Sequence, residues 1–188
     1  MALVIKGSTS GQVTIDVPAE SGTNTLTIPA STGTLLTTSN QSTNTPAFIV
    51  SANASTALSE TTNTKVAFDT EILDTDGAFD TSTYRFTVPS GKGGTYMISA
   101  FGRIDSAANS NLNISQFNIY LNGSATTRTY NYFNNNPITA ISHNATTILD
   151  LSAGDYVEMY AYIDSVDNTG GIVNSASYGR FCGHKLIT

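Results

Sequence analysis

The sequence predicts an all-β protein, and three observations support this fold class. Charged residues make up only 12% of the 188-residue chain, whose polarity comes mainly from Thr, Ser and Asn. β-branched Thr suits a pleated strand, whereas Ser, Asn and Gly favour turns. Short runs of strand-forming residues recur between Gly, Asn, Asp and Pro turn signals, and no helical period of useful length occurs. This pattern indicates a sandwich, a jelly roll or a barrel.

The chain changes character near residue 46, which predicts two parts, 1–45 and 46–188. The first part has no aromatic residue and contains two short alternating strands, each ended by a proline, Pro18 or Pro29. Such strands are marginal alone, so they must bury apolar side chains against a partner, most simply copies of themselves. A flexible linker is the alternative. The side chains expected to anchor this stalk are Val13, Ile15, Val17, Leu26 and Ile28.

The residue pattern of the second part predicts nine strands. They are 47–50, 64–68, 84–88, 94–104, 115–121, 126–132, 142–151, 155–163 and 178–188. In the strand 155–163, one face carries Val157, Met159, Ala161 and Ile163 and belongs in the core. The opposite face carries Tyr156, Tyr160 and Tyr162, where a solvated strand would carry Thr, Ser or Lys. Amphipathic rings there predict a subunit interface, with a covering sheet or loop of the same chain as the alternative.

Composition argues against several classes of partner. The net charge is −6, and eight Lys and Arg form no basic run, which argues against binding nucleic acid or an anionic membrane. The apolar run at residues 2–5 is too short for a signal peptide, so we expect synthesis in a cytoplasm without a conventional export signal. Cys182 is the only cysteine and is expected to be a small buried apolar residue.

No pattern of residues supports catalysis or a cofactor. His143 and His184 are far apart in sequence, and neither a nucleophile elbow nor a His-Glu-x-x-His motif is present. The run Asp74-Thr75-Asp76-Gly77 has some features of a calcium loop, but it lacks the third carboxylate and the distal Glu. We expect a solvated acidic loop with an Asp-Gly turn, and calcium remains the alternative.

One stretch is the best candidate for ligand recognition. Aromatic rings stack on the apolar faces of sugars, and amides exchange hydrogen bonds with sugar hydroxyls. The candidate residues are Tyr130, Asn131, Tyr132, Phe133, Asn134 and Asn135. The alternative, slightly favoured because Tyr130 and Tyr132 share a face at period two, is that the aromatic residues belong to the core or to an interface.

Four sequence elements occur in order within residues 46–188. They are Phe68-x5-Asp74-x4-Phe79-x6-Phe86-x7-Gly94-x-Tyr96-x-Ile98, Leu121-Asn122-Gly123, Leu149-x-Leu151-x-x-Gly154-Asp155-x-Val157, and Phe181-x-Gly183 followed by Leu186-Ile187. Together they resemble the signature of the C1q/tumour-necrosis-factor-like domain, apart from a longer loop before Gly94 and Ile98 in place of Phe. The resemblance implies a ten-strand jelly roll assembled as a homotrimer.

The first part has a likeness of its own. Residues 7–11, 17–19, 22–30 and 32–35 closely resemble a segment of tail-fibre and other virion proteins of tailed bacteriophages, Gly-Ser-Thr-Ser-Gly … Pro-Ala … Gly-Thr-Asn-Thr-Leu-Thr-Leu-Pro-Ala … Thr-Gly-Thr-Leu. This likeness implies a location in the virion and other virion proteins as partners of the N-terminus.

The combined expectation is a non-enzymatic, trimeric fibre or spike protein of a tailed phage. The first part would anchor it on the particle, and the C1q-like knob would attach to a host-surface glycan or protein, with avidity from three copies. The alternatives are a capsid decoration or head-fibre protein with a mainly structural role, and a cellular C1q-like binding module. A glycan-degrading enzyme comes last, because it needs a carboxylate pair in a groove.

Overall fold

The computed structural model describes residues 3–6, 8–15, 43–134 and 136–186. It divides into two units, Met1–Gln41 and Ser42–Thr188. In the first unit, β1 (Leu3–Lys6) and β2 (Gln12–Ile15) form an antiparallel hairpin. The turn includes Gly11, whose φ of 80° suits a residue without a Cβ.

Only part of the predicted stalk, residues 1–45, lies within the described residues, and the hairpin belongs to that part. The backbone of Val13 and Ile15 lies in β2, but their side chains are outside the described part of the chain, as are Val17, Leu26 and Ile28 entirely. The strand β1 was not expected, because its four residues gave too short a pattern. The anchoring role of the five residues therefore stays a prediction.

The second unit is almost entirely β-structure, with one short helix. Its elements are β3 (Ala47–Ser51), β4 (Thr56–Leu58), β5 (Thr64–Lys65), β6 (Thr70–Asp74), β7 (Phe79–Asp80), β8 (Arg85–Thr87), β9 (Gly94–Ser106), β10 (Leu112–Leu121), β11 (Ser124–Tyr132), β12 (Ala140–Leu151), β13 (Tyr156–Ser165), β14 (Gly171–Val173), α1 (Ser175–Tyr178) and β15 (Arg180–Lys185).

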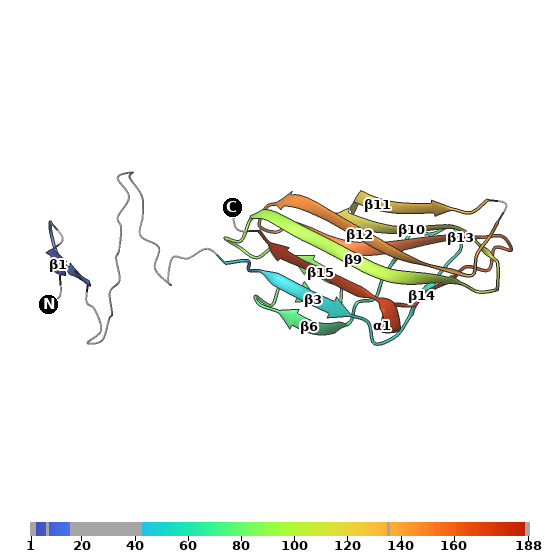
Figure 1. Cartoon of the computed structure of the whole chain (residues 1–188), viewed down its shortest axis with the longest axis horizontal. Helices are drawn as coiled ribbons and strands as arrows, with labels where there is room; N and C mark the ends of the chain where they lie inside the picture. Colours follow the sequence, from blue (N-terminus) through green and yellow to red (C-terminus); the bar gives the residue numbers. More distant parts are fainter. Residues whose placement is uncertain (1–2, 7, 16–42, 135, 187–188) are drawn as a thin grey trace, which may run out of the picture. The chain divides into compact units, whose positions relative to one another are not determined.

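These strands form two sheets that face each other, as Figure 1 shows. The six-stranded sheet has the order β11-β10-β13-β8-β7, with β5 also paired to β13. The seven-stranded sheet has the order β4-β14-β9-β15-β3-β6, with β12 also paired to β9. All of the strand pairings are antiparallel, so the predicted jelly-roll sandwich is confirmed as the fold class.

Aromatic side chains join the two sheets through the core. The ring of Phe48 from β3 stacks on Phe86 from β8 with centroids 4.6 Å apart, and it meets Phe181 from β15 edge-on at 5.1 Å. Phe68 and Phe79 are buried beside them. Gly183 leaves space for this packing, because a Cβ there would lie 2.8 Å from the Phe48 ring.

The nine predicted strands are present, with shifted ends. The elements that were missed are short: β4, β6, β7, β14 and α1. Three of them correct specific expectations. The acidic loop near Asp74 contains β6 and β7, since Thr70–Asp74 pairs with β3 and Phe79–Asp80 pairs with β8. Tyr178 ends α1 instead of beginning the last strand.

His143 connects the sheets near one edge of the sandwich. It projects from β12 of the seven-stranded sheet, with Nε2 2.9 Å from Ser115 Oγ and Nδ1 2.8 Å from Thr129 Oγ1, both on the six-stranded sheet. Its ring stacks on Phe117 at 5.1 Å. Only 5% of the residue is exposed, and burial lowers its pKa from 6.5 to about 4.

His143 should therefore make the folded unit acid-sensitive. Between pH 6.5 and about 4, the unfolded chain binds a proton that the folded chain does not, so stability falls as the pH falls. A shift of this size corresponds to roughly 3 kcal/mol at most. Chemical unfolding at several pH values should show a shallower pH slope for His143→Gln than for the wild type over this window. Equal slopes would contradict the buried neutral imidazole.

Candidate functional site

The outward face of the seven-stranded sheet is apolar at one end and has no covering element among the residues that the structure describes. Ile148 on β12 is 63% exposed, Leu73 on β6 42% and Met97 on β9 36%. Strand register brings them together, because Met97 pairs with both Ile148 and His184, while Ile49 pairs with both Leu73 and Cys182. We call this surface the apolar face; its members are Ile49, Leu73, Met97, Ser99, Thr146, Ile148, Cys182 and His184.

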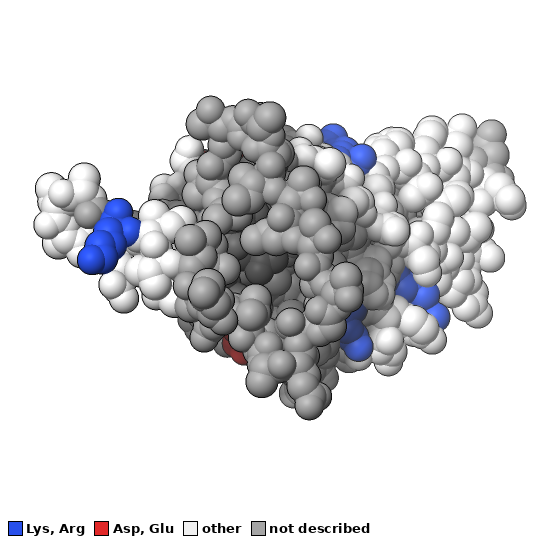
Figure 2. Space-filling model, turned by 60° about the vertical axis from the view of Figure 1, so that its left-hand side comes forward, with Lys and Arg blue, Asp and Glu red and all other residues white. Residues whose placement is uncertain are grey.

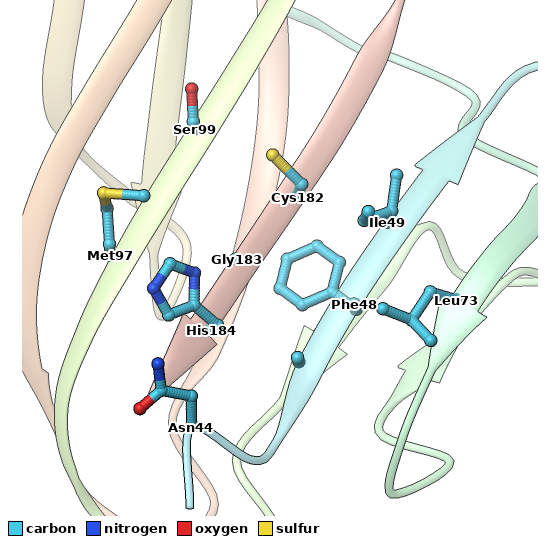
Figure 3. Close-up of a pocket in the computed structure, with 10 residues that line it drawn as sticks. Asn44, Phe48, Ile49, Leu73, Met97, Ser99, Cys182, Gly183 and His184 are labelled. Carbon is cyan, nitrogen blue, oxygen red and sulfur yellow. The ribbon is translucent and has the colours of Figure 1, made fainter. Parts of the chain in front are cut away.

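A hollow of about 350 Å³ lies in the apolar face. Figure 3 shows β15 running between β9 and β3, with Cys182 and His184 on β15, Met97 and Ser99 on β9, and Ile49 on β3 around the hollow. Such a shape can receive an apolar side chain of a partner.

Cys182 differs from its prediction. It lies in β15 as expected, but it is only partly buried and faces the hollow instead of the core. The core position next to it is taken by Phe181, which is fully buried. Desolvation raises the pKa of the Cys182 thiol, which lowers its thiolate fraction at neutral pH.

The outward face of the six-stranded sheet is polar and largely paired within the chain. Glu158, 2% exposed, binds Lys65 Nζ at 2.6 Å and Arg85 Nη2 at 2.8 Å. Burial would raise the pKa of Glu158, but the hydrogen bonds and charges of the two cations lower it overall. The ring of Tyr156 lies 3.7 Å under the Arg85 guanidinium.

The three tyrosines predicted at a subunit interface lie on this face. Tyr156, Tyr160 and Tyr162 are half-buried, and the Tyr160 ring lies 4.2 Å from the ring of Tyr120 in the same chain. The core side of β13 is as predicted, because Val157, Met159, Ala161 and Ile163 are all buried. Whether the tyrosines also meet another subunit stays a prediction.

The predicted recognition residues that the structure describes point in different directions, and their role in ligand binding stays a prediction. Tyr130 and Tyr132 project outward from β11 with 54% and 55% exposed, so they are not core residues. Asn131 points the other way, with Nδ2 3.4 Å from His143 Nδ1, and Phe133 packs against the core. Asn134 is exposed in the following turn, and Asn135 lies outside the described residues.

The acidic loop is held by bonds within the chain. The Asp74 carboxylate accepts hydrogen bonds from the backbone amides of Asp76 and Phe79, at 3.2 and 2.7 Å. Asp76 pairs with Lys92 at 3.1 Å. Within the described ranges, no group of three His, Cys, Asp or Glu side chains is placed to hold a metal ion.

A second hollow lies further along the seven-stranded sheet, beside α1. It measures about 540 Å³ and is lined by Phe101, Ser142, Asn144, Ser177, Tyr178 and Arg180, with the backbone of the neighbouring strand positions. We call it the Arg180 groove. Sequence reasoning missed it, because its residues come from three separate segments and only the strand register and α1 bring them together.

Charged side chains are sparse on the surface. Among the described atoms visible in Figure 2, uncharged residues predominate. Across the part of the chain that the structure describes, no helix is long and apolar enough to cross a bilayer.

The two facing antiparallel sheets define a jelly-roll domain of the kind shared by C1q and tumour-necrosis-factor-like proteins. The C1q domain family model matches residues 47–186, and the chain belongs to this family. Domains of this kind generally act as binding modules and not as enzymes. No curated protein sequence matches the chain.

Solved structures agree on the fold. The globular domain of zebrafish complement 1qA protein is similar, with a TM-score of 0.55 and 16% identity over 76% of this chain and 98% of that one. Murine APRIL matches with a TM-score of 0.55 at both pH 5.0 and pH 8.0, with 12% and 11% identity, over 74% of this chain and 98% of that one. At these identities the likeness establishes the fold alone.

Proposed function

We propose that the protein is a trimeric fibre or spike protein of a tailed-phage virion. Its first part would anchor it on the particle, and its C1q-like knob would attach to the host surface. The proposed assembly rests on the apolar face, which none of the residues described by the structure covers. The placement on a virion is supported by the likeness of residues 7–35 to phage virion proteins.

The charge of the chain favours the apolar face as the interface between copies, which we call the seam. Each chain carries a net charge of −6, so copies repel one another unless they meet through an uncharged surface. None of the residues of the apolar face is Asp, Glu, Lys or Arg. Exposed aliphatic side chains around a hollow are the features of an interface core, and a cyclic arrangement buries the face in every copy. The tyrosine face of β13 is the competing seam.

A trimeric knob suits attachment to a cell surface. Three identical binding sites on one knob convert weak single contacts into stable attachment, because the second and third contacts form within the same complex. Attachment through binding alone also agrees with a family whose domains generally bind and do not catalyse.

Assembly can be tested by substitution on each face. Light scattering on the wild type should give three times the chain mass of 19.8 kDa. Ile148→Asp should yield monomers, since a carboxylate buried in the seam is costly. The matched control Val166→Asp, at a residue 59% exposed in a loop, should leave the trimer intact. Trimers that survive Ile148→Asp but dissociate with Tyr162→Asp would move the seam to the tyrosine face, and a monomeric wild type would refute the assembly.

Electron microscopy of labelled particles tests the location. Phage particles carrying a C-terminal tag on this protein, decorated with anti-tag gold, should show label at the tail or its fibres. Label confined to the head would support the capsid decoration alternative. Purified, infectious particles without the protein would contradict a virion role and favour a cellular binding module.

A further inference from the structure

Two tyrosines and a glutamine form a row across the outward face of the six-stranded sheet. Tyr130 on β11 pairs in register with Gln116 on β10, and Gln116 pairs in turn with Tyr162 on β13. Directly opposite residues point to the same side of a sheet, and Phe117, the next residue of β10, is buried in the core, so the three side chains point outward. We call this row, together with Tyr132 further along β11, the Tyr130 patch.

The amide of Gln116 is the unusual group in the Tyr130 patch. Gln116 is only 8% exposed, yet its amide makes no hydrogen bond with any of the described residues. The polar atoms that are both enclosed and unpaired in the described part of the chain are the Oδ1 atoms of Asn113 and Asn118, so the amide of Gln116 still reaches the surface. A largely buried polar side chain normally has a partner, and this amide is free to bond a group that a ligand supplies.

Aromatic rings flank this amide on both sides. Tyr130 and Tyr132 are 54% and 55% exposed, which is a large apolar area for two neighbouring positions of one strand. On the other side of Gln116, Tyr162 is half-buried. Burial chiefly raises the pKa of Tyr162, and the phenol of Tyr130 is among the nearby groups that raise it further, so the two hydroxyls lie close together.

The distribution of charge favours an uncharged ligand. The neighbouring rows carry one charge of each sign, because Arg128 lies opposite Asn118 on one side and Asp164 lies opposite Ile114 on the other. The Tyr130 patch itself contains no Asp, Glu, Lys or Arg. The net charge of −6 on each chain also repels an acidic ligand.

The Tyr130 patch stays accessible when copies meet through the apolar face. Strands β10, β11 and β13 belong to one layer of the sandwich, and β9, β12 and β15 belong to the other (Figure 1). The apolar face lies on the outer side of the second layer, and the Tyr130 patch lies on the outer side of the first. Each copy in the proposed trimer would therefore present one patch.

We propose that the Tyr130 patch binds an N-acetylated hexose of a surface glycan. The Gln116 amide donates a hydrogen bond to the acetamido carbonyl and accepts one from the neighbouring ring hydroxyl. The acetamido methyl group and the C–H face of the ring pack on Tyr130 and Tyr162. This inference rests on the proposed attachment role and gives its ligand class.

The test compares two trisaccharides with the same linkage. Isothermal titration of the full-length protein with triacetylchitotriose should show binding. Cellotriose, which has a hydroxyl in place of each acetamido group, should bind at least about tenfold more weakly, because the Gln116 amide then loses a partner. Gln116→Met keeps the side-chain length but removes the amide, so it should bring the affinities of the two sugars to within about twofold of each other.

A pair of tyrosine variants locates the site. Tyr130→Ala should weaken binding of triacetylchitotriose at least about fivefold, since the ring supplies a stacking surface. The matched control is Tyr178→Ala, at a tyrosine on α1 that is 49% exposed, and it should change the affinity by less than about twofold.

Several outcomes would overturn the proposal. They are no binding of triacetylchitotriose, equal binding of cellotriose, equal effects of the two tyrosine variants, or tighter binding of the acidic sugar trigalacturonate. Light scattering on Tyr130→Ala separates this site from the proposed assembly. Weakened sugar binding by an intact trimer supports the site, and dissociation of the trimer would make the Tyr130 patch an interface and overturn the proposal. A monomeric wild type that still binds the sugar would refute the assembly alone.

Discussion

The aromatic packing of Phe48 against Phe86, and of Phe181 against Phe79, is the contact on which the rest of the domain depends, because it fixes one sheet on the other. It uses the inner face of each sheet and leaves one outer face of each for other purposes. Around β13, the six-stranded sheet pairs its outer face through the ion pairs of Glu158, while Tyr130 and Tyr132 on β11 are exposed. On the seven-stranded sheet, the aliphatic side chains of Ile148 and Met97 are exposed. A face of this kind in a chain of net charge −6 supports the proposed association with another copy, which offers an uncharged counterpart.

The same strands carry two kinds of surface. At one end of β9, Met97 pairs with Ile148, and the neighbours are aliphatic. Near the middle of β9, Phe101 pairs with Asn144 and Arg180, and the neighbours are aromatic, amide and cationic.

The sequence predicted those features of the fold that depend on a local pattern of residues. Period-two alternation located the long strands and identified Val157 and Ile163 as core residues, and the C1q-like elements identified the fold. Strands of two or three residues, such as β5 or β14, carry too little pattern to define their ends. The exposed face was missed because Tyr96 and Ile98, which point inward, alternate with an equally apolar Met97. Long-range features, the His143 network and the Arg180 groove, depend on register between segments distant in the chain.

The most direct test of the central claim, that a second copy covers the apolar face, uses the single thiol of the chain. Cys182 lines the hollow, so its alkylation by iodoacetamide reports whether that face is open. At protein concentrations where the wild type is assembled, the thiol should react slowly, and Ile148→Asp should accelerate the reaction under the same conditions. Equal, rapid alkylation of the wild type and the variant would show that the apolar face is open in the assembled protein and would contradict the seam.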